Sequence, residues 1–417
     1  MIYIGLAIIA LSIYLLVRQY ESRMVLLAAG IAMAAIAGDP LAAFDAFSKS
    51  MVNGALIQAI CSVMGFAFVM KLTECDKHLV NLFGNGLRKI RPVLVPAAVM
   101  ATFAINVALP SAAGAAAAVG AIFIPILISS GVHPATAGAA VLAGTFGSML
   151  NPGLSHNPFV AKLAGVGPMD VIAVHAKADI IGGLIGAFSL AIVDKYLTKD
   201  KAYGQGKTAD EMKKTSVNLL YAIIPLLPVV LLMLGTVSSL PVLKKVGVPH
   251  AMLIGAIIAL AVTRKKPQEI TKAFFEGMGN AFANIMGIII AAGVFVGGMT
   301  SIGLVKAFID LLTHATGVVK YAATFGPFLL AVIAGSGDAA AFAFNEAVTP
   351  HAQKFGLEVI NMGSIAALTG CFGRTMSPIA GATIVCATIA GVSPMELAKR
   401  NAPGMIIATI VSMFILL

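Results

Sequence analysis

The sequence predicts an all-α polytopic membrane protein built from two repeats of opposite topology, with re-entrant hairpins and broken helices. The composition is the first observation: 59% of the 417 residues are hydrophobic, only 11% are charged, and the mean hydropathy is +0.96. Soluble domains average about 25% charged residues, so water is not the solvent for most of this surface. The second observation is a series of long uncharged stretches, which are typical of transmembrane helices. The third is an internal repeat, in which residues 144–170 resemble residues 370–396.

Apolar segments in the first half define its expected spans. The N-terminal segment has no basic n-region and no small-residue cleavage site, which predicts a retained first span rather than a signal peptide. An amphipathic pattern predicts an interfacial helix near residues 75–87. We expect membrane spans over residues 2–17, 24–37, 52–71, 93–107, 115–129, 134–149 and 171–193.

The second half repeats this succession. An interfacial helix is again expected, near residues 304–316. We expect spans over residues 219–237, 251–262, 280–299, 322–333, 339–353, 361–373 and 405–417.

The chain therefore divides into a first repeat over residues 1–193, a cytoplasmic linker over residues 194–216 and a second repeat over residues 217–417. The linker carries six lysines, and basic residues also gather near residues 18–23, 88–91 and 263–266. Because basic loops face the cytoplasm, the linker lies inside and both termini lie outside. The second half then begins on the opposite side from the first, which is an arrangement common in secondary transporters.

The repeat motif breaks the helical pattern in each half. "GTFGSMLNPG" begins at Gly144 and "GCFGRTMSPI" begins at Gly370, and ten of the 27 aligned positions are identical. Glycine and proline beside polar residues inside an apolar segment predict an unwound helix.

An earlier break in each half predicts the tip of a hairpin that enters the membrane. Pro110 and Gly114 interrupt the first half, and Gly335 and Gly337 interrupt the second. Backbone groups that are unpaired at membrane depth must lie within protein or line a cavity. We therefore expect the two tips and the two unwound loops to meet near the membrane midplane.

The polar residues of these breaks suit a small carboxylate. Exposed helix N-termini attract anions, and the guanidinium of Arg374 can bind a carboxylate through two parallel hydrogen bonds. Hydroxyl and amide groups would then hold the second end of a short diacid. The expected substrate-binding residues are Asn106, Ser111, Thr145, Ser148, Asn151, Asn157, Ser336, Gly337, Thr369, Arg374, Thr375 and Ser377.

Three further residues are candidates for coupling-ion or proton binding: Asp338, Glu346 and His156. Asp338 lies in the second tip, where the first half has Ala112. For Arg374, a structural salt bridge to Asp338 or Glu346, or an extended conformation that reaches the membrane interface, remains an alternative to substrate binding. For Asp338 the alternative is a capping role in the hairpin, and for His156 that of a hydrogen-bonded neighbour. For Asn106 and Asn157 the alternative is a hydrogen bond to the backbone of a loop.

The tips and loops of the two halves resemble those of a known superfamily. The tips "LPSAAG" and "GSGDAA", followed by unwound Gly/Pro loops in two inverted halves, resemble the ion transporter superfamily. The length, the central linker and the repeated phrases resemble its DcuC family of anaerobic C4-dicarboxylate transporters. This resemblance implies a scaffold part that forms a homodimer, and a transport part that moves as an elevator. It also implies exchange or proton-coupled transport of succinate, fumarate or malate in the bacterial inner membrane.

The tips depart from the Ser-Asn-Thr pattern of many relatives, because only the serines remain. The family roles therefore carry over to Ser111 and Ser336, to the loop at Asn151 and Pro152, and to residues 375–378. This departure argues against sodium as the coupling ion and favours a proton carried by Asp338.

Other functions are less well supported by the sequence. No nucleophile–base pair, metal cluster or cofactor motif is apparent, so we expect neither an enzyme nor a bound cofactor. The net charge of +10 is concentrated in loops and does not indicate nucleic-acid binding. The alternatives that remain are a carrier of another organic anion, such as citrate, gluconate or a short-chain fatty acid, and an anion channel.

Overall fold

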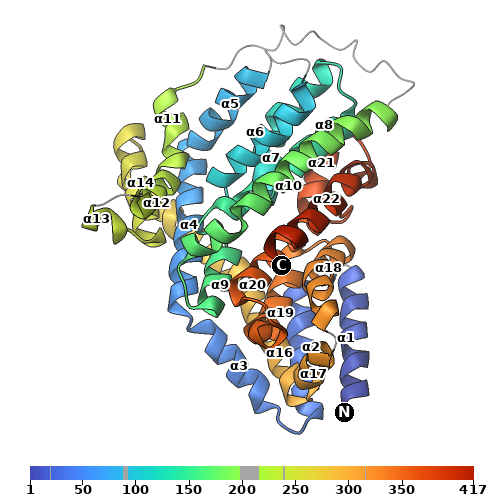
Figure 1. Cartoon of the computed structure of the whole chain (residues 1–417). Coiled ribbons are helices and arrows are strands. Elements are labelled where there is room, and N and C mark those ends of the chain that lie inside the picture. The colour runs from blue at the N-terminus through green and yellow to red at the C-terminus, as the bar shows by residue number, and fades with distance from the viewer. Residues whose placement is uncertain (19, 88–92, 198–215, 238–239, 315) are drawn as a thin grey trace.

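The computed structural model describes residues 1–18, 20–87, 93–197, 216–237, 240–314 and 316–417, which form helices joined by short loops (Figure 1). Most of the predicted linker and the basic segment 88–91 lie outside these residues. The first half contains α1 (Ile2–Val17), α2 (Ser22–Ile36), α3 (Leu41–Met51), α4 (Gly54–Thr73), α5 (Cys75–Leu87), α6 (Leu94–Ala108), α7 (Ala112–Ser129), α8 (Pro134–Ala143), the 3-10 helix η2 (Gly147–Leu150), α9 (His156–Ala164) and α10 (Pro168–Leu197).

The second half opens with α11 (Leu219–Ile223), η3 (Ile224–Leu226), α12 (Leu227–Val237), α13 (Pro241–Lys244), α14 (Val248–Thr263) and α15 (Pro267–Ala281). It continues with the π-helical turn η4 (Phe282–Met286), α16 (Gly287–Ser301), α17 (Leu304–His314), α18 (Thr316–Ala334), α19 (Gly337–Ala347), η5 (Thr349–Phe355), α20 (Val359–Thr375), α21 (Gly381–Ala390) and α22 (Pro394–Leu416).

Among the described residues, six helices are long and apolar enough to cross a membrane. A seventh span is possible in length and composition if α21 and α22, which meet at 117°, form one broken span. Several shorter apolar helices accompany them, including α1, α2 and α6. The prediction of a polytopic helical membrane protein is confirmed.

The structure differs from the expected spans where the chain changes direction. The span expected over 134–149 ends at Ala143 and resumes as η2, and the span expected over 339–353 is split between α19 and η5. Conversely, α15, η4 and α16 run as one helical stretch. The helices α3, α9 and α21 lie outside the expected set, because each is short and two of them follow a predicted break.

The two copies of the repeat motif share the elements that follow the break, a short helix and then a long one, whereas η2 of the first copy corresponds to the continuous end of α20 in the second. Gly165 and Gly391 end α9 and α21 in the left-handed conformation, with φ of 70° and 67°. Pro168 and Pro394 then occupy the first position of α10 and α22, where proline is favoured because its missing N–H has no helical acceptor.

A close backbone approach also recurs in both copies. A side chain at Gly147 would collide with the carbonyl oxygen of Phe103, and one at Gly373 would collide with that of Phe328. Glycine at these two positions therefore lets the motif pack directly on α6 in the first half and on α18 in the second.

The helices of the two halves interlock. In the second half α14 and α15 pack against α4, and in the first half α2 and α3 pack against α16. The helices α10 and α22 pack along each other, with Gly404 beside the backbone of Gly186. Figure 1 shows α6, α7, α8, α10, α21 and α22 together at the upper right, and α1, α2, α16 and α17 below.

The glycine at position 373 gives a test of this packing. We expect Gly373→Ala to lower the free energy of unfolding by about 1–3 kcal/mol, the usual cost of overpacking, because the new methyl group meets the Phe328 carbonyl. Gly381→Ala is the matched control, since a side chain there meets no atom within 4 Å. Thermal unfolding of the purified protein in detergent measures both, and equal stabilities of the two variants would contradict the close approach.

Candidate functional site

The two copies of the repeat motif contact each other directly. The rings of Phe146 and Phe372, which occupy equivalent positions, pack edge to face with centroids 4.9 Å apart. Phe103 extends this contact, with its ring 5.5 Å from that of Phe146. The unwound segment after α8 therefore lies against the C-terminal part of α20.

Arg374 crosses from one half to the other at this contact. Its Nη2 donates a hydrogen bond of 3.1 Å to the carbonyl oxygen of Thr145, and its position in the last turn of α20 suits a cation. Its Nη1 is buried and has no hydrogen-bond partner in the described part of the chain. The expected alternative, a salt bridge to Asp338 or Glu346, is not present among the ion pairs within 4 Å of the described residues.

Two of the expected coupling residues are neighbours. His156, at the start of α9, lies 3.0 Å through its Nε2 from Oδ1 of Asp338, at the start of α19. The His156 side chain is 1% exposed, whereas that of Asp338 is 45% exposed. The imidazole also lies against the ring of Phe342, with centroids 4.7 Å apart. A buried base and a half-exposed acid are therefore joined across the two halves, and their role in coupling stays a prediction.

The amide side chains that were expected to bind substrate instead satisfy the broken backbone. Asn106 accepts a 2.8 Å hydrogen bond from the amide of Ser148, and Asn151 donates one of 2.7 Å to the carbonyl of Val107. Asn157 donates to the carbonyls of Met149 and Asn151 at 2.7 and 2.8 Å. These bonds hold the segment between α8 and α9 in place, which favours a structural role for all three amides.

The hairpin tips have the same local structure in both halves. The hydroxyl oxygen of Ser111 accepts a hydrogen bond from the Gly114 amide, and that of Ser336 accepts one from the Ala339 amide, each at 3.2 Å. Both serines are thus N-caps. Gly337 follows the second cap, and a side chain there would meet the carbonyl oxygen of Gly370 in α20. The second tip therefore packs closely on the repeat motif.

The first tip lies in a different environment. Ser111 and Pro110 form part of the wall of a cavity of about 580 Å³ between α4, α5 and α7. Most of its lining is apolar, and its charged side chains are Lys71, Asp76 and Lys77. The first tip thus lines a cavity with three charged side chains, whereas the second lies at Arg374 and His156; the expected meeting of the two tips stays a prediction.

The remaining expected residues are mostly hydroxyls that bond within their own helix. Buried Thr145, Thr369 and Thr375 donate to carbonyls three or four residues earlier, a common arrangement of threonine in helices. Ser377 is buried and its hydroxyl has no partner among the described residues. Glu346 lies within electrostatic range of Lys162 of α9 rather than pairing with Arg374.

Two buried polar residues of α10 lie outside the set of site residues predicted from the sequence. His175 and Asp179 are both fully buried, and Nε2 of His175 lies 3.0 Å from Oδ1 of Asn157. They are four residues apart in an apolar segment, so both point to one face of the helix. Asp179, like Arg374, is a charged residue within an apolar stretch, and that pattern is the signal in the sequence that identifies it.

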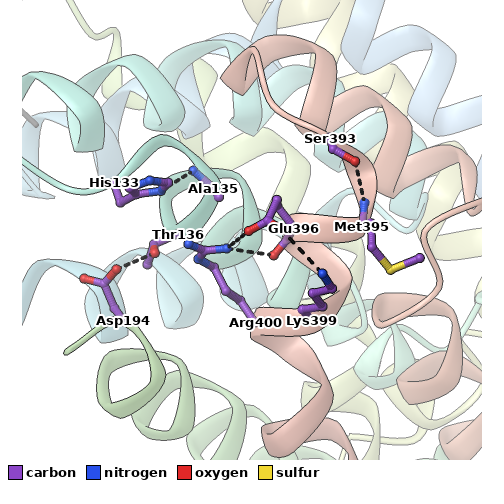
Figure 2. A network of polar contacts seen from close by, with 9 residues as sticks. All are labelled: His133, Ala135, Thr136, Asp194, Ser393, Met395, Glu396, Lys399 and Arg400. Atoms are coloured by element: carbon purple, nitrogen blue, oxygen red, sulfur yellow. Dashed lines mark hydrogen bonds and ion pairs between the residues drawn. The ribbon is translucent and has the colours of Figure 1, made fainter. Parts of the chain in front are cut away.

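A second polar network lies away from this site, where α8, α10 and α22 meet (Figure 2). Arg400, whose side chain is 4% exposed, donates to a Glu396 carboxylate oxygen at 2.6 Å. Nearby, the Thr136 hydroxyl donates to Asp194 at 2.5 Å. Figure 2 shows these pairs side by side next to the C-terminal end of α10. The bond between Thr136 and Asp194 joins α8 to α10 close to the start of the predicted linker, whereas the Glu396–Arg400 pair lies within α22.

Comparison with known proteins identifies the chain's relatives. Residues 22–417 match the DcuC family, described as C4-dicarboxylate anaerobic carriers. An uncharacterized transporter of Haemophilus influenzae is 49% identical over 273 residues, which are 63% of this chain and 98% of that protein. A second uncharacterized transporter of that organism is 54% identical over 127 residues, or 30% of this chain and 88% of its own.

The anaerobic C4-dicarboxylate transporter DcuC of Escherichia coli K12 is 25% identical over 367 residues, which cover 86% of this chain and 79% of that protein. The family match spans nearly the whole chain and agrees with its apolar helices. The chain therefore belongs to the DcuC family of C4-dicarboxylate anaerobic carriers, and it is a multi-pass membrane transporter rather than an enzyme.

Proposed function

We propose that this protein is a secondary transporter that moves succinate, fumarate or malate across the bacterial inner membrane by exchange or together with protons. The observation that carries the proposal is the geometry of Arg374. One guanidinium nitrogen is fixed on the Thr145 carbonyl, while the other is buried and has no partner among the described residues. A buried charge of this kind is costly unless it is paired, and a carboxylate of the substrate can pair with it.

The surroundings of Arg374 suit a carboxylate. The N-terminus of α19 packs against α20 through Gly337, and the Cβ of Arg374 lies beside that glycine. The positive end of this helix adds to the charge of the guanidinium. The unpartnered hydroxyl of Ser377 lies three residues beyond Arg374. We assign the first carboxylate of the substrate to Arg374 and the tip of α19.

The cavity at the first tip supports an access route for anions. Lys71, Asp76 and Lys77 lie in the wall that also contains Ser111. Lys77 pairs with Glu74 at 2.6 Å, so Lys71 is the residue that we assign to attracting an anionic ligand. A volume of about 580 Å³ is ample for a four-carbon diacid. We propose that substrate enters through this cavity before it reaches Arg374.

We further propose that the two halves have inverted topology. Three features support this. The two motif copies share the short helix and the long helix that follow the break. Helix α4 of the first half packs on α14 and α15 of the second, and α16 of the second half packs on α2 and α3 of the first. The linker between the halves is basic. Inverted repeats place substrate sites at discontinuous helices near the midplane, which is where the motif copies would lie.

An elevator mechanism in a homodimer completes the proposal. Arg374 and Thr145, Phe146 and Phe372, and His156 and Asp338 tie the two motif copies together. Asn401 of α22 adds hydrogen bonds to carbonyls of α8 and α20, at 3.3 and 3.2 Å. We assign α6–α10 and α18–α22 to the moving part and the remaining helices to the dimeric scaffold.

Counterflow tests the transport class. In proteoliposomes loaded with unlabelled succinate, we expect faster uptake of labelled fumarate than in empty proteoliposomes, because an exchanging carrier returns loaded more readily than unloaded. Liposomes without protein are the control. Uptake that is unaffected by internal succinate would indicate a channel, and acceleration only by citrate, gluconate or a short-chain fatty acid would indicate another organic anion as substrate.

The anchor role of Arg374 is tested by Arg374→Lys, which keeps the charge but loses the planar fork. We expect succinate affinity to fall about 10–100-fold, because hydrogen bonds to charged groups are worth about 1.5–3 kcal/mol. Ligand-induced thermal stabilisation over a panel of mono-, di- and tricarboxylates measures this effect. Arg264→Lys, in the exposed turn after α14, is the control; equal affinities of the two variants would exclude the anchor role.

Reporter fusions test the topology. We expect a reporter inserted at residue 205 or at residue 264 to lie in the cytoplasm and one fused after residue 417 to lie outside, because basic loops remain inside. Reporter activity in intact cells measures the side. Residue 205 and the C-terminus on the same side of the membrane would refute the inverted arrangement.

A further inference from the structure

The buried carboxyl group of Asp179 has no partner in the site described so far. Asp179 is 0% exposed, and neither of its carboxylate oxygens has a hydrogen-bond partner among the described residues. An ionised carboxylate in such a place would cost several kcal/mol, because neither water nor a cation compensates its charge. A carboxyl group at this position needs either a proton or a compensating cation.

Near Asp179, the face of α10 that packs against other helices is mostly uncharged. On α10 itself, His175 lies one turn before Asp179 on the buried face, and Gly182 one turn after it lies against the ring of Phe372. Lys177 is exposed and lies on another face. Asp170 is exposed in the first turn of α10. Asp194, Lys195 and Tyr196 lie about 22 Å or more from Asp179 along the helix axis, at about 1.5 Å per residue.

The elements packed against α10 supply few titratable groups. They are α6, α8, η2, α9, α20 and α22, and the first three contain no titratable side chain. In α9 these groups are buried His156 and exposed Lys162, and in α20 they are Cys371 and Arg374. The Cys371 thiol lies within electrostatic range of Asp179 and beside the His156 ring.

The charged residues of α22 are far from this point. Glu396, Lys399 and Arg400 lie in its first two turns, where they pair with one another. The antiparallel pairing of α10 and α22, with Gly186 beside Gly404, places Asp179 near the level of Ser412. Ser412 is also fully buried, and its hydroxyl is without a partner in the described residues.

These groups connect Asp179 to the candidate site. Asp338 is half-exposed and contacts His156. The other ring nitrogen of His156, Nδ1, is buried and has no hydrogen-bond partner among the described residues. The Cys371 thiol interacts electrostatically with both the His156 ring and the Asp179 carboxyl. An accessible acid, a buried base and a buried acid thus follow one another from α19 through α9 to α10.

We propose that Asp179 binds the proton that accompanies the dicarboxylate, with Asp338 and His156 as its route from water. The proposal rests on the proposed carrier function. In this scheme a proton from water binds Asp338 and moves to His156. Neither Nδ1 of His156 nor the Asp179 carboxyl has a hydrogen-bond partner among the described residues, so the two groups are not in contact here. The last transfer therefore takes place in a conformation that brings them together, and the reverse order releases the proton. The net change is one proton bound or released, and no other bond is made or broken. Arg374 lies one turn beyond Cys371 on α20, which packs against α10. A dianion bound at Arg374 adds negative charge on this side of α10, and added negative charge opposes ionisation of Asp179.

Transport assays test this assignment with Asp179→Asn, which has the shape of the protonated acid but cannot release a proton. In proteoliposomes we expect this variant to retain succinate counterflow and to lose the stimulation of net uptake by an inward proton gradient. Asp170→Asn, which changes an exposed acid on the same helix, is the matched control and should retain both. Gradient stimulation in Asp179→Asn equal to that of the control would overturn the assignment.

The wild-type protein separates this inference from the function on which it rests. Wild-type counterflow without any response to a proton gradient would overturn the inference and leave the carrier function standing. Wild-type protein without counterflow would contradict the carrier function itself, and the inference would fall with it.

Infrared spectroscopy gives a readout that does not depend on transport. The carbonyl-stretch band of a protonated carboxyl group should be present in the purified wild-type protein, be lost in Asp179→Asn and move in Asp179→Glu. The Glu variant keeps a titratable group, so it should also retain part of the gradient stimulation. A band that is the same in all three proteins would refute the assignment.

Discussion

The need to satisfy backbone polar groups away from water governs the architecture of this protein. Wherever a helix stops inside an apolar segment, its free amides and carbonyls need partners. Asn106, Asn151 and Asn157 supply them for the segment between α8 and α9, and all three are buried. The position of Thr145, and hence of the guanidinium that binds its carbonyl, depends on these three amides.

In the second half, the backbone groups at the helix break are satisfied in another way. The helix α20 continues to Thr375, so fewer backbone groups are left free, and Asn401 of α22 binds the Thr375 carbonyl. Arg374 can therefore use one nitrogen for the Thr145 carbonyl and keep the other available. The first half contributes the more extensively broken backbone, between α8 and α9, and the second half contributes the charge of Arg374.

Much of the fold follows from the sequence because hydropathy and helix breakers act locally. The helix over 75–87 has the bounds that its amphipathic pattern predicts, and its position at the membrane interface stays a prediction. The capping serines of both hairpins lie at the predicted tips. A backbone role for Asn106 and Asn157 was one of two alternatives, but their partners were not predictable, because Asn106 and Ser148 are 42 residues apart and their hydrogen bond depends on tertiary packing. Asp179 lies in an unbroken helix, where no helix break marks a site in the sequence.

The contact between Phe146 and Phe372 has a consequence for the origin of the chain. Under the proposed symmetry these residues are equivalent, and equivalent residues touch only where the two-fold axis passes between them. A single ancestral half could have made this same contact with a second copy of itself, as a homodimer of small subunits. Joining two such halves in one chain freed each copy to diverge, and a serine at position 148 beside an arginine at position 374 is a difference that no symmetric dimer can encode.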